Sequence, residues 1–187
     1  MGKLIMWNMM TLDGYFEGPG HDISWHEACW GEELEAFSIE QGKAAGALLF
    51  GRATYELMAG HWSSAKGTIA DFMNALPKIV ASRSLKNAEW NNTRIIEEDV
   101  AGNVAKLKRD TDKDIYLFGS ANLAAELAVH GLFDEIRIGL NPVLLGEGTP
   151  LFEGWPKGLQ LELIDTRPLK IGAVILFYRP KNSTTSA

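Results

Sequence analysis

The chain alternates between two kinds of apolar pattern, and this alternation restricts its fold more than any other feature. Continuous apolar runs of strand length stand at residues 3–10, 46–50, 78–82 and 114–118. Segments with the 3.6-residue spacing of amphipathic helices lie between them, as at residues 32–45, 68–76 and 100–109. Helices between buried strands are typical of parallel sheets, because the chain must cross back before the next strand begins. The sequence therefore predicts an α/β domain.

Single residues indicate how the predicted helices are placed and where they begin and end. Leu34, Phe37 and Ala44 fall on or near one side of the helix predicted at residues 32–45. Asp99 is a typical N-cap for the helix at 100–109. Gly131 is suited to the left-handed position that commonly ends a helix.

The pattern changes in the C-terminal part of the chain. Residues 135–140 alternate between apolar and other side chains, and residues 159–165 and 173–179 have the composition of two further strands. We expect these to form an antiparallel edge on the parallel sheet. The predicted organisation is one domain over residues 1–180 and a polar tail at 181–187.

Composition excludes several classes of partner. The chain has 187 residues, of which 46% are hydrophobic and 22% charged, as expected of a folded globular protein. Its 18 Lys and Arg against 24 Asp and Glu give a net charge of -6, so nucleic acid and anionic membranes are not expected as partners. A single cysteine permits no intrachain disulfide, and no leader or long apolar run is apparent, so we expect a cytoplasmic protein.

A short run, Trp-His-Glu-Ala-Cys-Trp at residues 25–30, contains three residue types that can bind zinc. The zinc deaminase pattern also needs a Pro-Cys-x-x-Cys segment, which the sequence lacks. We therefore predict no metal site and interpret His26, Glu27 and Cys29 as loop and packing residues.

The first candidate binding corner follows the strand at 46–50. Gly51 ends that strand, Arg52 supplies a positive guanidinium, and Thr54 could cap the helix that begins there. Ligands of open parallel sheets bind beyond the carboxyl ends of the strands, and a helix N-terminus attracts anions. An ordinary turn with Thr54 as N-cap would explain the same residues.

Two further corners have the same position relative to a strand. Ser82, Arg83 and Ser84 combine hydroxyl groups with a guanidinium, which suits the 2′-phosphate of NADP, although a solvated loop would look the same. Gly119, with the small Ser120 and Ala121 after it, allows close backbone approach to a pyrophosphate at a helix N-terminus. The G-x-G-x-x-G fingerprint is absent, so a conventional Rossmann assignment has no support.

Several stretches, in this order and spacing, resemble the dihydrofolate reductase superfamily: "TLDGYFEG", "LLFGRATYE", "IVASRS" and "GLFDEIRIGLNPVLLGEGTPLF". They are most similar to the C-terminal reductase domain of the bacterial bifunctional deaminase-reductase of riboflavin biosynthesis. The resemblance implies a three-layer α/β fold with a mostly parallel sheet of about eight strands. It also implies NADPH as cofactor, hydride transfer to a heterocyclic C=N or C=O, and a homodimer.

The resemblance assigns roles to the corner residues. Cofactor phosphates would be held by Gly51, Arg52 and Thr54, the 2′-phosphate by Ser82 and Arg83, and the pyrophosphate by Gly119, Ser120, Ala121, Asn122 and Leu123. The backbone around Asn8 and Met9 would face the nicotinamide.

Asp13 is the predicted catalytic residue, because it matches a position typical of the riboflavin-type relatives. An Asp-Gly pair is also common in turns. Glu32, Glu33 and Glu35 stand near the place of the acid of dihydrofolate reductases, yet acids are favoured in any first helical turn.

We therefore expect an NADPH-dependent reductase of a nitrogen heterocycle, resembling 5-amino-6-(5-phosphoribosylamino)uracil reductase. The alternatives are a reductase of a pteridine or small carbonyl compound and a non-catalytic NADPH-binding protein. Trp25, Trp30 and Trp62 could line a pocket for the flat ring of the substrate.

Overall fold

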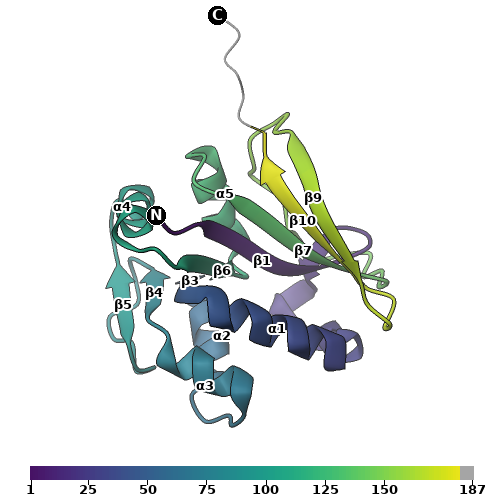
Figure 1. Cartoon of the computed structure of the whole chain (residues 1–187), viewed down its shortest axis with the longest axis horizontal. Coiled ribbons are helices and arrows are strands. Elements are labelled where there is room, and N and C mark those ends of the chain that lie inside the picture. The colour runs from purple at the N-terminus through teal and green to yellow at the C-terminus, as the bar shows by residue number, and fades with distance from the viewer. Residues whose placement is uncertain (182–187) are drawn as a thin grey trace, which may run out of the picture.

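An eight-stranded sheet forms the centre of the computed structural model, which describes residues 1–181 (Figure 1). The strands lie in the order β5-β4-β3-β6-β1-β7-β10-β9. Their bounds are β1 Leu4–Thr11, β3 Ala45–Gly51, β4 Lys78–Ala81, β5 Thr93–Ile96, β6 Asp114–Phe118, β7 Glu135–Asn141, β9 Leu161–Pro168 and β10 Val174–Pro180. Neighbours from β5 to β7 pair in parallel, whereas β10 is antiparallel to β7 and β9. The predicted mostly parallel sheet with an antiparallel C-terminal edge is confirmed.

Helices cover both faces of the sheet. On one face lie α1 (Glu32–Ala44), α2 (Arg52–Trp62) and α3 (Thr68–Ala75), and on the other lie α4 (Val100–Asp110) and α5 (Ala121–Val129) (Figure 1). Along β1, Leu4 and Met6 pack in the core on the α4–α5 face, and Ile5 and Trp7 pack on the opposite face. Burial on both faces explains why the central strands are continuous apolar runs.

The long loop after β1 contains structure that the sequence did not indicate. Strand β2 (Tyr15–Glu17) pairs with the distant β8 (Thr149–Pro150) in a separate two-stranded sheet. Two 3₁₀ helices follow, η1 (Pro19–His21) and η2 (Ser24–Cys29). Because β1 ends at the edge where ligands of parallel sheets bind, this loop supplies further walls to that edge.

Two of the predicted helix-end residues are confirmed. The Asp99 carboxylate accepts a hydrogen bond from the Gly102 backbone N–H at 3.1 Å, and Gly131 has φ 62° just after α5. The prediction that Thr54 caps the helix was wrong, because α2 already begins at Arg52 and Thr54 lies inside its first turn.

The buried face of α1 also differs from expectation. Leu34, Phe37 and Gln41 are its buried residues, at a spacing of three and four, while Ala44 is exposed at the last position of the helix. A polar amide therefore occupies a core-facing position that the apolar pattern could not reveal.

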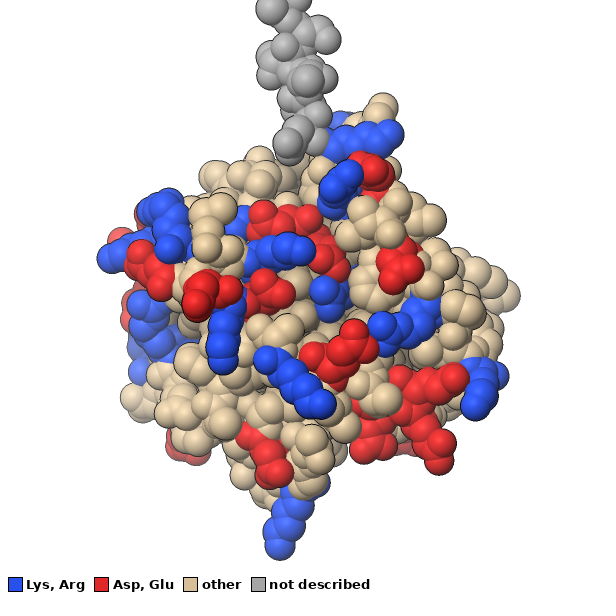
Figure 2. Space-filling model, viewed as in Figure 1, with Lys and Arg blue, Asp and Glu red and all other residues tan. Residues whose placement is uncertain are grey.

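Positive and negative side chains are interspersed over the face shown in Figure 2, with no broad region of one sign. Every helix among residues 1–181 is too short or too polar to traverse a lipid bilayer. Of the predicted polar tail, residues 182–187 lie outside the described part of the chain.

Candidate active site

The three predicted corners meet at one edge of the sheet. They follow β3, β4 and β6, which are neighbouring strands with parallel directions. A cavity of about 610 Å³, here called the strand-end cavity, lies there. The predicted residues that line it are Gly51, Arg52, Thr54, Ser82, Arg83, Ser120, Ala121, Asn122 and Leu123.

Hydrogen bonds join the corner after β3 to the corner after β6. The Gly51 backbone N–H donates to Ser120 Oγ at 2.8 Å, and the Ser120 and Thr54 hydroxyl oxygens are 2.8 Å apart. The N–H of Gly51 is therefore satisfied within the protein. Gly51 and Thr54 therefore hold the wall of the strand-end cavity in shape, because their polar groups are bonded to Ser120.

The N-terminus of α5 offers free donors instead. Ser120, at the N-cap position, has left-handed φ and ψ of 59° and 57° and makes no side-chain cap to its own helix. The first N–H groups of a helix have no partner within it, and here Ala121, Asn122 and Leu123 line the cavity. Together with the helix dipole they form a site suited to a phosphate.

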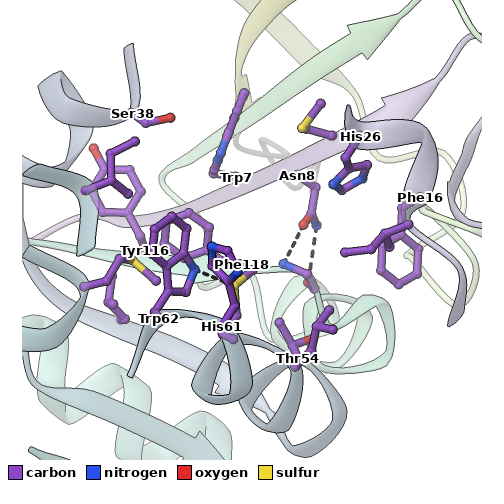
Figure 3. A pocket seen from close by; sticks show the side chains of 18 of the residues that line it. Trp7, Asn8, Phe16, His26, Ser38, Thr54, His61, Trp62, Tyr116 and Phe118 are labelled. Carbon is purple, nitrogen blue, oxygen red and sulfur yellow. Dashed lines mark hydrogen bonds between the residues drawn. The ribbon is translucent and has the colours of Figure 1, made fainter. Parts of the chain in front are cut away.

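Gly119 is required by both conformation and space. Its φ is 57°, and a Cβ there would lie 2.8 Å from the side chain of Thr54. Asn8 holds this glycine from β1: Asn8 Oδ1 accepts from Gly119 N at 2.6 Å, and Asn8 Nδ2 donates to Gly119 O at 3.3 Å (Figure 3). Both ends of the Asn8 amide are thus occupied, and Asn8 positions the corner.

The two arginines of the strand-end cavity differ in their partners. Arg52 donates to Glu56 and to Ser84, both at 2.8 Å. The Arg83 side chain makes no hydrogen bond or ion pair with any residue in 1–181, so its guanidinium is available to a ligand. Glu97, Glu98 and Asp99, which follow β5, line the same cavity.

A second cavity of about 950 Å³, here called the aromatic cavity, lies between β1 and the helices of the α1–α3 face. Its lining includes the aromatic residues Trp7, Phe16, Trp62, Tyr116 and Phe118 (Figure 3), together with Trp30 and Phe72. Trp30 and Trp62 thus lie where the sequence predicted, whereas Trp25 is buried outside the lining. Asn8, Thr54 and Gly119 also line this cavity.

The two cavities adjoin. Phe16, Glu17, His21, Ala53 and Thr54 line both of them. Glu17 is buried, and its Oε1 lies 2.7 Å from His21 Nδ1 and accepts from Thr149 Oγ1 at 2.8 Å. The loop after β1 therefore places a buried carboxylate and an exposed imidazole at the junction.

His26, interpreted from the sequence as a packing residue, lies in the wall of the aromatic cavity near Asn8 (Figure 3). Burial lowers the pKa of its imidazole to about 4, so the ring is neutral at physiological pH. Glu27 also lines the cavity, whereas Cys29 is buried outside the lining. Residues 1–181 contain no cluster of three or more His, Cys, Asp or Glu side chains that could hold a metal ion.

Asp13 is placed away from both cavities. Its carboxylate accepts from Thr11 Oγ1 at 2.6 Å and from the backbone N–H groups of Leu145 and Gly146 at 3.0 and 2.7 Å. The bond from Thr11, followed by the bond from Gly146, lowers the pKa of Asp13. Asp13 anchors the loop that follows β7, and this placement gives no support to its predicted catalytic role.

The acids of α1 are equally remote, because Glu32, Glu33 and Glu35 line neither cavity. Glu33 instead accepts from the Lys170 backbone N–H at 2.6 Å.

A polar cluster that the sequence pattern does not predict lies at the wall of the aromatic cavity. Arg137 Nη1 donates to Tyr116 Oη at 3.0 Å and to Gln41 Oε1 at 3.1 Å, and Arg137 Nε donates to Glu135 at 2.6 Å. Because its oxygen is occupied, Gln41 keeps its amide nitrogen as the available donor. Tyr116 and Gln41 line the cavity, whereas Arg137 and Glu135 lie behind them.

Comparison with known proteins agrees with this architecture. The chain is 30% identical over 182 residues to "Uncharacterized protein YyaP" of Bacillus subtilis (strain 168), covering 94% of each protein. Its structure superposes with a TM-score of 0.79 on a provisionally assigned riboflavin biosynthesis protein of Shewanella sp. PV-4, at 19% identity, covering 96% of this chain and 99% of that one.

The dihydrofolate reductase of Enterococcus faecalis, solved with NADP(H) and RAB-propyl, superposes with a TM-score of 0.66 at 17% identity, covering 97% and 98% of the two chains. The fold is therefore dihydrofolate reductase-like. The model of the RibD C-terminal domain family matches residues 2–176, so the chain belongs to that family.

Proposed function

We propose that this protein is an NADPH-dependent reductase of a planar nitrogen heterocycle. The proposal depends on one observation: two cavities of different character adjoin. The strand-end cavity has free backbone donors and a free guanidinium, and the aromatic cavity is lined by aromatic rings. A dinucleotide with a phosphorylated end and a flat reactive ring matches this pair of environments. Membership of the RibD C-terminal domain family supports the same assignment.

The residues present fit such a cofactor. The uncapped N-terminus of α5 would hold the pyrophosphate, and Arg83 with Ser82 would bind the 2′-phosphate. Gly119 has no Cβ, so the backbone held by Asn8 leaves room for the nicotinamide where the two cavities adjoin. The aromatic cavity would then hold the substrate ring against it.

When bound, NADPH supplies a hydride to the carbon of a C=N or C=O bond, and one proton from the protein or solvent completes the reduction. We assign the path of this proton to Glu17 and His21. Glu17 is buried at the junction of the cavities, and the side chain of its partner His21 is 76% exposed to solvent. This pair replaces Asp13 as the proton source.

Quenching of tryptophan fluorescence by NADPH and NADH tests the cofactor assignment. We expect wild-type protein to prefer NADPH, and Arg83→Ala to weaken NADPH binding by about tenfold to a hundredfold while NADH binding is unchanged, because the lost bond is charge-assisted. Arg94→Ala, an exposed arginine of β5 outside both cavities, is the matched control. A preference for NADH would assign Glu97 and Glu98 to the ribose hydroxyls and contradict the proposal.

A non-catalytic NADPH-binding protein is the second candidate, and the absence of an α1 acid from the cavity lining of the described residues favours it. Following NADPH absorbance with dihydropteridines, aminouracil nucleosides and quinones decides between the two. Turnover of any of these compounds rejects the non-catalytic alternative. A homodimer remains a prediction, which sedimentation velocity would test.

A further inference from the structure

The charges around the aromatic cavity restrict the substrate. None of the residues in 1–181 that line this cavity is a lysine or an arginine, although the chain has 18 of them. Three carboxylates, those of Glu17, Glu27 and Glu56, line it instead. Glu27 and Glu56 are both exposed, and Glu56 is paired with Arg52. An anionic group approaching from solvent would therefore meet the negative charge of Glu27.

Three cations contact residues of the wall, and each is already held by protein groups. Arg137 is held by Glu135 at 2.6 Å, and its side chain is 15% exposed. Lys78 is fully buried and donates to the carbonyl oxygens of Met73 and Asn74, both at 2.9 Å. Arg52 is held by Glu56 and Ser84 on the side of the strand-end cavity. None of these guanidinium or ammonium groups is left to neutralise a phosphate or carboxylate in the aromatic cavity.

Two of the three histidines that line this cavity do not supply the missing charge. His26 is neutral at physiological pH, and His21 is paired with Glu17. His61 lies on α2 beside Trp62, with ring centroids 4.6 Å apart, and is exposed. An anion moved from water into the interior of this cavity would lose its hydration without gaining a cationic partner.

The wall does contain neutral hydrogen-bond donors. The Gln41 amide nitrogen is the free end of a side chain whose oxygen is held by Arg137. The Tyr116 hydroxyl accepts from the same guanidinium, which leaves its own proton to donate. Both groups suit a carbonyl oxygen or an unprotonated ring nitrogen on a flat molecule.

We propose that the substrate is an uncharged planar ring compound that carries a carbonyl or imine acceptor and no phosphate or carboxylate. The proposal rests on the proposed function for the identity of the site, and it departs from the phosphoribosyl substrate implied by resemblance to the riboflavin enzyme. The aromatic cavity binds the ring between Trp62, Tyr116 and Phe118, with Gln41 at its edge.

Riboflavin and FMN are matched probes, because they share one flat ring and differ only by a phosphate. Binding is measured from quenching of flavin fluorescence with NADP⁺ saturating, so that the strand-end cavity cannot take the FMN phosphate. We expect riboflavin to bind at least about tenfold more tightly than FMN. Equal affinity, tighter binding of FMN, or no binding of either flavin would overturn the inference.

A charge introduced at the cavity mouth provides a second readout. Leu57 lines the aromatic cavity and is 49% exposed. Leu57→Arg should strengthen FMN binding relative to riboflavin by about two- to fivefold, the range expected for an exposed ion pair. Leu144→Arg adds the same charge at an exposed leucine outside both cavities and should leave the ratio unchanged. An unchanged ratio in Leu57→Arg would count against the inference.

Titration with NADP⁺ alone, performed first, separates this inference from the proposed function. Failure of NADP⁺ to bind contradicts the proposed function. Binding of NADP⁺ together with a preference for FMN contradicts only the substrate class.

Discussion

The two adjoining cavities are built in different ways. The strand-end cavity takes most of its walls from short segments that directly follow β3, β4, β5 and β6, with a smaller part from the loop after β1, from α5 and from Thr149 of β8. The aromatic cavity is lined by residues of β1, β3, β6, α1, α2 and α3 and of the long loop after β1. The first depends on backbone geometry at strand ends, and the second depends on side chains brought together by packing. The comparison predicts that their functions can be lost separately.

Gly119→Ala should have the largest effect. Gly119 lines the aromatic cavity, but it leads directly into the N-terminus of α5 at the strand-end cavity, so we expect the loss to fall on cofactor binding. A Cβ at this left-handed position would lie 2.8 Å from Thr54, so the corner has to move. We expect NADPH affinity to fall by about a hundredfold, the cost of a misplaced site, and unfolding free energy to fall by about 1–3 kcal/mol.

Fluorescence titration and urea unfolding measure these two quantities. Gly60→Ala is the matched control, because Gly60 lies in α2 with open space around its Cβ position, and it should raise stability slightly. Wild-type affinity in Gly119→Ala would break the assignment of this corner to the cofactor.

Separate substitution of the two candidate acids, Glu17 and Asp13, tests which of them delivers the proton. Glu17→Gln should lower kcat by about a hundredfold if the Glu17–His21 pair delivers the proton. Asp13→Asn should change kcat little, because Asp13 lines neither cavity and its carboxylate is held by Thr11, Leu145 and Gly146. Steady-state kinetics with both variants would contradict this assignment if the large loss appeared in Asp13→Asn alone.

The pH dependence of stability tests the interior of the aromatic cavity. Burial lowers the pKa of His26 from 6.5 to about 4, so the unfolded state binds more protons between these values. Stability from this group is therefore present above pH 6.5 and is lost as the pH falls toward 4, by about 3 kcal/mol at most.

Urea unfolding between pH 7 and pH 4 measures the slope of the unfolding free energy against pH. His26→Gln should flatten it, and His130→Gln, an exposed histidine after α5, should not. Equal slopes in wild type and His26→Gln would show that the imidazole is hydrated and that the cavity is more polar than described.

Trp62→Leu should have the smallest effect, and it should separate substrate binding in the aromatic cavity from cofactor binding in the strand-end cavity. Trp62 lines only the aromatic cavity, so substrate KM should rise about tenfold from loss of ring contacts, with NADPH affinity unchanged. Trp155→Leu is the control, since Trp155 stacks on Phe133 outside both cavities. A parallel loss of NADPH binding in Trp62→Leu would show that the two cavities act as one.

The same contrast explains what the sequence could predict. The strand-end corners can be predicted because each is a local motif directly after an apolar run. Small residues stand at all three corners, and an arginine stands at two of them, Gly51–Arg52 and Ser82–Arg83, but not at Gly119–Ser120. The fold was predicted because both faces of the central strands are buried, which leaves a plain apolar signal.

Residues of the aromatic cavity carry no such local signal. Gln41 occupies a buried position of α1 where the helical pattern would predict an apolar residue. Arg137 stands at a polar position of the alternating pattern in β7, which does not distinguish it from a solvent-facing residue. Their roles arise from a contact across 96 positions of the chain. The Asp-Gly motif at Asp13 is also local, and the hydrogen bonds of its carboxylate show a local use, as a loop anchor.

A crystal structure of the protein with NADPH would show directly whether one cofactor spans both cavities. We expect the 2′-phosphate beside Arg83, the pyrophosphate at the N-terminus of α5, and the nicotinamide next to Gly119, facing the aromatic cavity. A cofactor bound elsewhere, or a nicotinamide turned away from the aromatic cavity, would contradict it.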